Sequence, residues 1–294
     1  GNTLVNAWPN ASQGGSGFTS PVAVIGNASV LAANADSNYY GLFWDGGNQR
    51  WRTALTGEIR FAPAIQSSLN LVHVLNGATL TTLQEGGVVR ATTLQPEPRT
   101  PVNIWFDTLL VGVGDGEDAR LLALARDNLE VRRQFMAPAG PIRMPAVGQE
   151  TIYVGANRLF AIDANLFDPN RPNVEIIWSD PIGVGAITLP PVYAYPGRRA
   201  LAELYAVESS RVHALDANTG MVIWSHDFGA EIKGLAVNEE NLFLVGDNKM
   251  RMVGREQNDT RWDKEFTGAV VGGPLVTDRV HAHDLGVFGR PLLE

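Results

Sequence analysis

The histidines His281 and His283 are the residues whose type and spacing come nearest to a metal site in this chain. Side chains alternate along a strand, so the two imidazoles would lie on one face, with Asp284 beside them. Such a cluster is part of a zinc site when further ligands join it, but no third histidine lies nearby in the sequence. Two ordinary strand residues are the simpler interpretation, and we predict no metal and no cofactor.

The segment from Gly112 to Gly116 has the glycine content of a phosphate-binding loop. A phosphate loop needs a following helix, whose backbone amides and dipole hold the anion. The residues from Arg120 onward read instead as a strand, so Asp115 to Asp118 is predicted to be a hairpin turn. The chain has no Gly-x-Ser-x-Gly nucleophile elbow and no recognisable spacing of Ser, His and Asp.

Composition narrows the classes of partner. The chain has 294 residues, is 45% hydrophobic and carries a net charge of −8, whereas nucleic-acid binders need a basic footprint. It has no cysteine, which excludes disulfides, thiolate zinc sites and thiol nucleophiles. No apolar run approaches the roughly 18 residues of a membrane span. No signal peptide is present, and we expect that a signal or anchor has been removed before Gly1.

The elements that must position these side chains are strands. Short apolar runs alternate with clusters of Gly, Asn, Asp and Pro, which is the pattern of an all-β chain. Tryptophan recurs after a strand and a turn, and in the same frame Ala91 and Arg132 occupy the gap in the series. The series has spacings of 38 to 46 residues and comprises Trp8, Trp51, Ala91, Arg132, Trp178, Trp224 and Trp262.

A second series has the same period. It marks the start of an apolar strand and comprises Pro21, Pro63, Pro101, Pro145, Pro190, Leu235 and Pro274. Seven units of about 42 residues, each with about four short strands, are typical of a β-propeller. We predict an all-β fold with one domain, residues 1–294: a seven-bladed propeller of four-stranded antiparallel blades. The N-terminal strand, residues 3–8, is expected to close the ring by pairing with a strand from residues 270–290.

One unit carries a recognisable motif. Ala214, Asp216, Thr219, Gly220 and Trp224 resemble the PQQ-like repeat of the quinoprotein propellers, Ala-x-Asp-x-x-Thr-Gly-x-x-x-Trp. The side chains of Asp216 and Thr219 can bond the turn backbone, Gly220 suits a positive φ, and Trp224 suits packing between blades. The layout of the whole chain is similar to the bacterial outer-membrane assembly propeller lipoprotein and to propeller sensor domains of membrane kinases.

Three cations occupy equivalent positions in the second series. The residues two places upstream of its members are Thr19, Phe61, Arg99, Arg143, Thr188, Lys233 and Gly272. If the strands that follow are the innermost of each blade, these positions surround the central channel. Arg99, Arg143 and Lys233 would then favour an anion or the carboxylate of a partner. Solvated charges on the rim are the alternative.

The resemblance leaves several functions open. Quinoprotein dehydrogenases share the repeat, but many members have a vicinal cysteine pair and a calcium site of carboxylates, and we can assign neither here. WD repeats compete at this period, but their dipeptide occurs only once in place, at Trp44-Asp45. We predict a non-catalytic scaffold in the periplasm or on the cell surface, which binds a protein or a small anion. Envelope protein assembly is the role that the resemblance implies. A quinone- or metal-dependent oxidoreductase and a ligand-sensing domain of a membrane receptor or kinase are the alternatives.

Overall fold

The described part of the chain is entirely β-structure. The computed structural model describes residues 22–25, 29–33, 37–137, 140–164, 176–179, 181, 183–195, 201–256, 258–268, 270 and 274. Within them lie 24 strands and two short 3₁₀ helices, η1 (Ser67–Leu69) and η2 (Gly116–Asp118). None of the helices in this part of the chain has the length or the hydropathy to cross a membrane.

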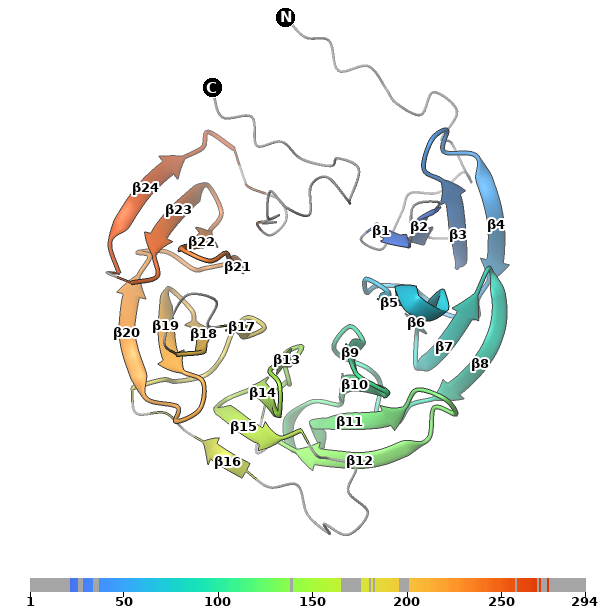
Figure 1. Ribbon diagram of the computed structural model, residues 1–294, viewed down its shortest axis with the longest axis horizontal. Coiled ribbons are helices and arrows are strands. Elements are labelled where there is room, and N and C mark those ends of the chain that lie inside the picture. The colour runs from blue at the N-terminus through green and yellow to red at the C-terminus, as the bar shows by residue number, and fades with distance from the viewer. Residues whose placement is uncertain are drawn as a thin grey trace, which may run out of the picture. The chain divides into compact units, whose positions relative to one another are not determined.

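The strands form six four-stranded antiparallel sheets, three in each of two compact units, Gly1–Met144 and Pro145–Glu294. In every sheet the strands lie side by side in chain order (Figure 1). The strands of the first unit are β1 (Ala23–Ile25), β2 (Ser29–Ala33), β3 (Asn38–Phe43), β4 (Gln49–Ala54), β5 (Ala64–Gln66), β6 (Leu71–Asn76), β7 (Thr79–Gln84), β8 (Gly87–Thr93), β9 (Asn103–Trp105), β10 (Thr108–Val113), β11 (Arg120–Ala125) and β12 (Val131–Met136). Those of the second unit are β13 (Ala146–Val147), β14 (Thr151–Gly155), β15 (Leu159–Asp163), β16 (Ile176–Ser179), β17 (Val192–Ala194), β18 (Glu203–Glu208), β19 (Arg211–Asp216), β20 (Val222–Asp227), β21 (Gly234–Val237), β22 (Asn241–Val245), β23 (Lys249–Gly254) and β24 (Thr260–Glu265).

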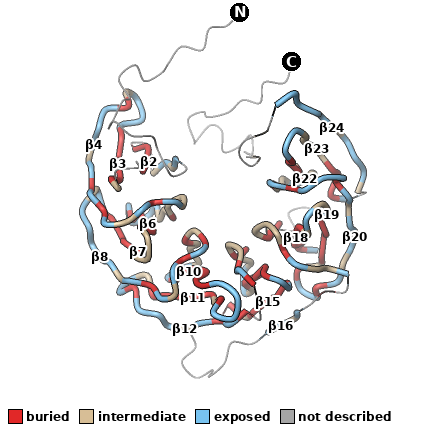
Figure 2. The backbone as a smooth tube through the Cα atoms, turned by 180° about the vertical axis from the view of Figure 1, so that it is seen from behind, coloured by how far each residue is buried: buried red, intermediate tan, exposed pale blue. Residues whose placement is uncertain are grey.

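Burial differs between the strands of one sheet. In five of the six described sheets the second and third strands are buried on both faces, and in β10 and β11 they are almost continuous apolar runs of Leu, Val and Ala. In the last described sheet, β22 and β23 are only partly buried. The fourth strands are mostly exposed, with partly buried residues at alternate positions, as in β20 (Figure 2). This difference explains why the sequence shows short apolar runs rather than a uniform alternation.

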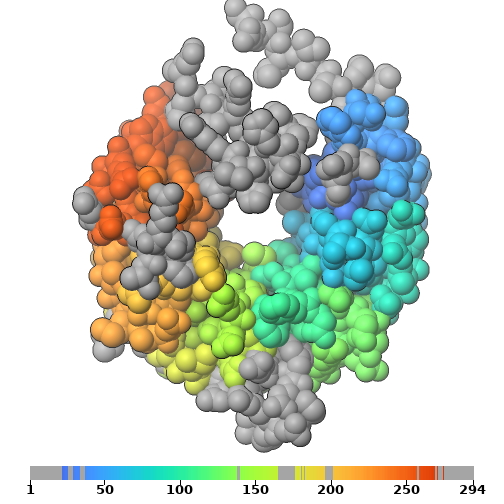
Figure 3. All heavy atoms as spheres, in the orientation of Figure 1, coloured from blue at the N-terminus to red at the C-terminus, as the bar shows by residue number. Residues whose placement is uncertain are grey.

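The cores lie between neighbouring sheets of the same unit. In the first unit, one cluster joins the sheet β1–β4 to the sheet β5–β8, and a second joins β5–β8 to β9–β12. In the second unit, two clusters join its three sheets in the same way. The first strands of adjacent sheets contact one another, β5 with β9, β13 with β17, and β17 with β21. Within each unit the sheets therefore pack face to face, without a gap between neighbours in the space-filling view (Figure 3).

The prediction of an all-β chain of four-stranded antiparallel blades is confirmed. The number of sheets among the described residues is six, where the sequence predicts seven blades. Residues 3–8 and 270–290, which the prediction pairs in the closing blade, lie outside the described residues except for positions 270 and 274. Trp8, Thr19, Gly272, His281 and His283 also lie outside them. The assignment of residues 1–294 to one domain stays a prediction.

Candidate functional site

Trp178 packs between its own sheet and the next one. Its side chain is half-buried, and its Nε1–H donates to the backbone oxygen of Ala217, 3.0 Å away in the turn between β19 and β20. The Tyr153 hydroxyl donates to the same oxygen at 3.1 Å, and the two rings lie 5.9 Å apart between centroids. Gly220 lies against this indole, since a Cβ there would come within 2.8 Å of Trp178 Cδ2. The aromatic pair of one sheet therefore closes on the turn of the next.

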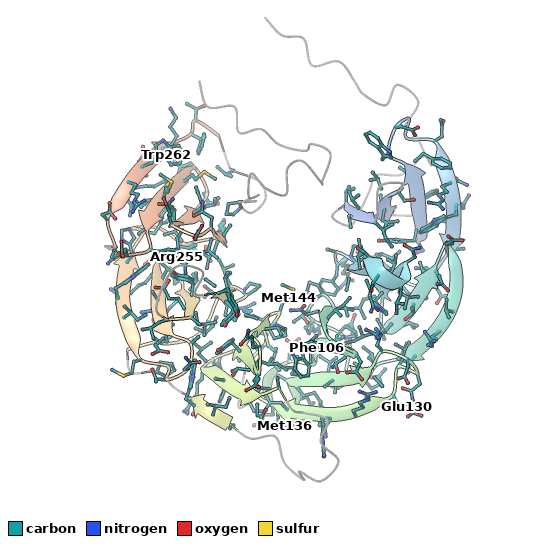
Figure 4. All side chains as sticks on the ribbon, in the orientation of Figure 1. Phe106, Glu130, Met136, Met144, Arg255 and Trp262 are labelled. Carbon is teal, nitrogen blue, oxygen red and sulfur yellow. The ribbon has the colours of Figure 1, made fainter. Side chains whose placement is uncertain are left out.

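Trp224 repeats this arrangement one sheet further along. Its Nε1–H donates to the backbone oxygen of Arg255 at 2.9 Å, and its ring lies 6.0 Å from that of Tyr205. The Arg255 guanidinium is buried here, on the side of its sheet that faces β17–β20 (Figure 4). It donates to Glu203 Oε2 at 2.9 and 3.0 Å and to the Tyr205 hydroxyl at 2.9 Å. The carbonyls of Asn238 and Glu239 take its remaining nitrogen. Each of the three nitrogens of this buried cation thus donates to at least one acceptor, as burial of a charge requires.

Trp51 and Trp262 occupy the corresponding places on β4 and β24. Trp51 is half-buried against Tyr39 of its own sheet and Gly86 of the next, where a Cβ would come within 2.8 Å of the indole. Trp262 is also half-buried and lies on the outermost described strand (Figure 4). Trp51, Trp178 and Trp224 thus pack against the neighbouring sheet, although none of them is fully buried. The packing role of Trp262 stays a prediction.

The turn after β19 has the hydrogen bonds that the motif predicts. Asp216 Oδ1 accepts the backbone N–H groups of Asn218 at 2.8 Å and Thr219 at 3.4 Å. Gly220 has φ +73°, in the left-handed region, and its N–H donates to the Asp216 oxygen at 2.8 Å. Only glycine takes this conformation at no steric cost, and the adjacent Trp178 leaves no room for a side chain.

The predicted anion-binding cations lie in both units, and two of them form local ion pairs. Arg99 Nε lies 2.8 Å from Asp115 Oδ2, and Lys233 forms an ion pair with Asp247. The two occupy the same place in their sheets, because the Arg99 N–H donates to Gly112 of the second strand and the Lys233 N–H donates to Val245 of the second strand. Arg143 is partly buried just before β13. Arg99 and Arg143 belong to the first unit and Lys233 to the second. Their convergence on one ligand stays a prediction.

Two comparisons with known proteins found a similar family and a similar fold. Residues 208–284 match the family model of the outer membrane protein assembly factor BamB. The fold is similar to the crystal structure of BamB from Moraxella catarrhalis, with a TM-score of 0.69 and 14% sequence identity, over 88% of this chain and 80% of that one. No curated protein sequence matches the chain.

The chain folds as a β-propeller.

The strand register of the propeller corrects two positions in the predicted tryptophan series. Each of the six described sheets has a β-bulge on its fourth strand. In four of them, the last fourth-strand residue that pairs before the register shifts is the tryptophan. In the other two sheets this residue is Arg90 and Arg133, rather than Ala91 and Arg132. The residue four places earlier has positive φ in each case, at Gly86 (φ +84°) and Leu129 (φ +62°).

The physical reason lies in the turns. Glu85 and Gly86 both have positive φ, so β7 and β8 are joined by a two-residue turn of the kind that favours hairpins. Gly87, which the sequence series uses as the turn residue, is already in β8. Leu129 is a bulky residue in the left-handed region, and its side chain is buried in the core, which offsets the backbone strain. Because glycine and asparagine are the usual residues at positive φ, the sequence pattern points to the neighbouring Asn128 as the turn residue instead of Leu129.

The glycine-rich segment of the repeat is a hairpin, as predicted. Gly112 is the penultimate residue of β10, Gly114 and Gly116 have positive φ, and strand β11 begins at Arg120 after the single turn η2. No α-helix follows that could bind a phosphate. Among the residues that the structure describes, no group of three His, Cys, Asp or Glu side chains lies close enough to hold a metal ion.

The propeller brings together three polar residues that the sequence did not single out. His213 Nδ1 lies 2.8 Å from Ser225 Oγ, and His213 Nε2 lies 3.1 Å from Glu208 Oε2. These residues come from three adjacent strands, β19, β20 and β18. His213 is directly opposite Ser225 in the pairing of β19 with β20. The pair of His213 and Ser225 could have been predicted from the sequence, because the motif that ends at Trp224 fixes how β19 pairs with β20.

Proposed function

We propose that this propeller is a protein-binding scaffold that works outside the cytoplasm in the assembly of outer-membrane proteins. The observation that carries the proposal is the twofold likeness to BamB, in the repeats of residues 208–284 and in the fold of 88% of the chain. The matched family model is named for an outer membrane protein assembly factor, and the same role is what the sequence resemblance implies. The fold alone does not decide function, so the exposed surface must supply the binding chemistry.

Apolar side chains on the fourth strands support a docking role. In the first unit they are exposed on β8 and β12, and in the second unit on β16 and β20. They comprise Val88, Val89, Val131, Met136, Ile176, Ile177 and Ile223. Each fourth strand also forms the edge of its sheet among the described strands. Exposed apolar residues on sheet edges are suited to binding other polypeptides.

The cations Arg99, Arg143 and Lys233 are proposed to bind carboxylates of the partner or a small anion. Arg99 and Lys233 now pair with Asp115 and Asp247, but all four side chains are exposed. Exposed ion pairs contribute only about 0–1 kcal/mol, so an incoming anion can displace the acidic partners at little cost. Arginine can hold a carboxylate through two parallel hydrogen bonds.

The scaffold role is tested in the organism that encodes the chain. Deleting the gene is expected to lower the amount of outer-membrane proteins in the envelope, and the intact chain is expected to restore it. The protein itself should fractionate with the periplasm or the envelope. Unchanged outer-membrane proteins in the deletion strain, or a chain found in the cytoplasmic fraction, would contradict the proposal.

The cation site is tested by titrating the purified chain with sulfate and with phosphate. Arg143→Ala is expected to weaken binding at least several-fold, whereas the control Arg60→Ala should leave it unchanged. Arg60 is a suitable control because it is an exposed arginine that also pairs with a carboxylate, Glu58, at 2.7 Å. Equal, negligible binding by all three proteins would leave Arg99, Arg143 and Lys233 as surface charges.

A further inference from the structure

The hydrogen bonds around His213 fix which of its nitrogens carries the proton. A carboxylate only accepts hydrogen bonds, so Glu208 Oε2, 3.1 Å away, requires a proton on Nε2. The neutral imidazole then has its lone pair on Nδ1, which lies 2.8 Å from Ser225 Oγ. The Ser225 hydroxyl therefore donates to a nitrogen that is free to take its proton. This order of serine, imidazole and carboxylate is the arrangement that activates a serine nucleophile.

The carboxylate at the end of this chain is held in place. Glu208 Oε2 also accepts the backbone N–H of Gly185 at 3.1 Å. A Cβ at position 185 would overlap the Glu208 carboxylate, so the approach depends on glycine. Glu208 is thus anchored at the end of β18 by a loop that precedes β17, and it orients the imidazole from the side opposite to Ser225.

Burial and exposure are divided as a reactive serine requires. The His213 side chain is 2% exposed, so it is shielded from competing water. Burial lowers its pKa, Glu208 partly opposes this, and Arg211 adds to the lowering, so the imidazole is neutral at pH 7 and can accept a proton. Ser225 is exposed on the fourth strand of its sheet, where a small molecule can reach it.

A second histidine shows what a purely structural pair looks like in this fold. His73 Nδ1 lies 3.0 Å from Thr82 Oγ1, its direct partner across β6 and β7. There, however, the hydroxyl is fully buried, and the histidine Nε2 has no hydrogen-bond partner within the protein. That pair lacks both the orienting carboxylate and the access to solvent that the Ser225 pair has.

We propose that Ser225 is a nucleophile for acyl transfer, with His213 as its general base and Glu208 as the positioning residue. Ser225 Oγ forms a bond to the carbonyl carbon of a small activated ester, while its proton moves to His213 Nδ1. The bond from that carbon to the leaving oxygen breaks, and the leaving alcohol takes the proton from Nδ1. Water then attacks the acyl-serine by the same route and releases the carboxylic acid. This activity is independent of the scaffold role.

The first test is covalent labelling of the folded, full-length chain with a fluorophosphonate probe, together with hydrolysis of p-nitrophenyl acetate. One adduct per chain is expected, located at Ser225 by peptide mass spectrometry. Ser225→Ala should abolish it, whereas the exposed control Ser68→Ala should not change it. Glu208→Gln should slow labelling by roughly 100-fold. The labelling rate should also fall at acid pH, where the imidazole takes up a proton and can no longer act as a base.

Absence of the adduct on the folded chain, or an adduct that persists in Ser225→Ala, would overturn the proposal. A second readout covers the case in which Glu208→Gln fails to fold. Because the chain has no cysteine, Ser225→Cys and Ser68→Cys each introduce a single thiol. Iodoacetamide should alkylate Cys at position 225 at least ten-fold faster than at position 68 at pH 7, since a paired imidazole favours the thiolate. Equal rates would show that His213 does not activate position 225.

Discussion

At the scale of single residues, the packing of three tryptophans depends on a small residue directly across the strand pair. Gly41 lies directly opposite Trp51 in the pairing of β3 with β4, and a Cβ there would overlap the indole ring. Alanine takes the same place opposite Trp178 and Trp224. A small residue across the strand pair is thus the counterpart of each of these three tryptophans.

Gly41→Ala is therefore expected to destabilise the protein by about 1–3 kcal/mol, as overpacking of a filled site does. The control is Gly268→Ala, where an added Cβ meets no atom within 4 Å and the backbone has no positive φ. Its effect should stay within about 0.5 kcal/mol. Urea unfolding of both variants measures the difference, and equal stabilities would mean that the indole does not occupy this position in solution.

His73 makes the stability depend on pH. Burial, followed by the charges of Arg126 and Arg90, lowers the pKa of His73 from 6.5 to about 4. Below pH 6.5 the unfolded chain binds a proton that the folded chain refuses, so stability falls as the pH falls towards 4. From pH 7 to pH 5 this residue should account for about 2 kcal/mol of the loss. Unfolding of the parent and of His73→Leu at both pH values measures it, and an equal loss in both would refute the assignment.

At the scale of elements, the contact between consecutive sheets is an aromatic side chain that closes on a neighbouring turn. Trp178 donates to the Ala217 carbonyl, and Trp224 donates to the Arg255 carbonyl. These contacts pair sheets within the second unit. The fourth strand of one sheet is thereby tied to the hairpin of the next, by packing and by one hydrogen bond.

Two substitutions at position 224 separate these contributions. Trp224→Phe keeps an aromatic ring but removes the N–H group, and it should cost about 1 kcal/mol. Trp224→Ala also removes the packing, and it should cost about 3 kcal/mol. The exposed Met221→Ala serves as the control, with an expected change within about 0.5 kcal/mol. If Trp224→Phe proves as damaging as Trp224→Ala, the hydrogen bond rather than the ring dominates the contact.

At the scale of the whole molecule, the two compact units are predicted to unfold together as one cooperative domain. The proposed propeller of residues 1–294 predicts a single unfolding transition. Trp224→Ala lies in the second unit, yet it should then shift the whole thermal transition by roughly 5–10 °C. Near- and far-ultraviolet circular dichroism measure this. Two separate transitions, of which the substitution shifts only one, would show that the units unfold independently.

Features that depend on short stretches of chain could be predicted from the amino-acid sequence. The turn from Asp216 to Gly220 was predictable, because an aspartate side chain, a glycine and a strand alternation act within about ten residues. The period of the repeats and the all-β fold followed, because every sheet reuses the same local pattern. Where the local pattern was weak the series slipped by one residue, to Ala91 and Arg132, because a shorter turn and a left-handed leucine carry no sequence signal.

Which polar groups meet across more than one hairpin could not be predicted from the sequence, because it depends on how the strands pair and pack. The pairing of Ser225 with His213 depends on strand register, and the carboxylate of Glu208 reaches the imidazole only because the Gly185 backbone holds it. Likewise, Arg99 and Lys233 looked alike as isolated cations, whereas the loops after their second strands supply each with a carboxylate. Side chains distant in sequence meet through packing, and their charges and protons are set by those neighbours rather than by spacing along the chain.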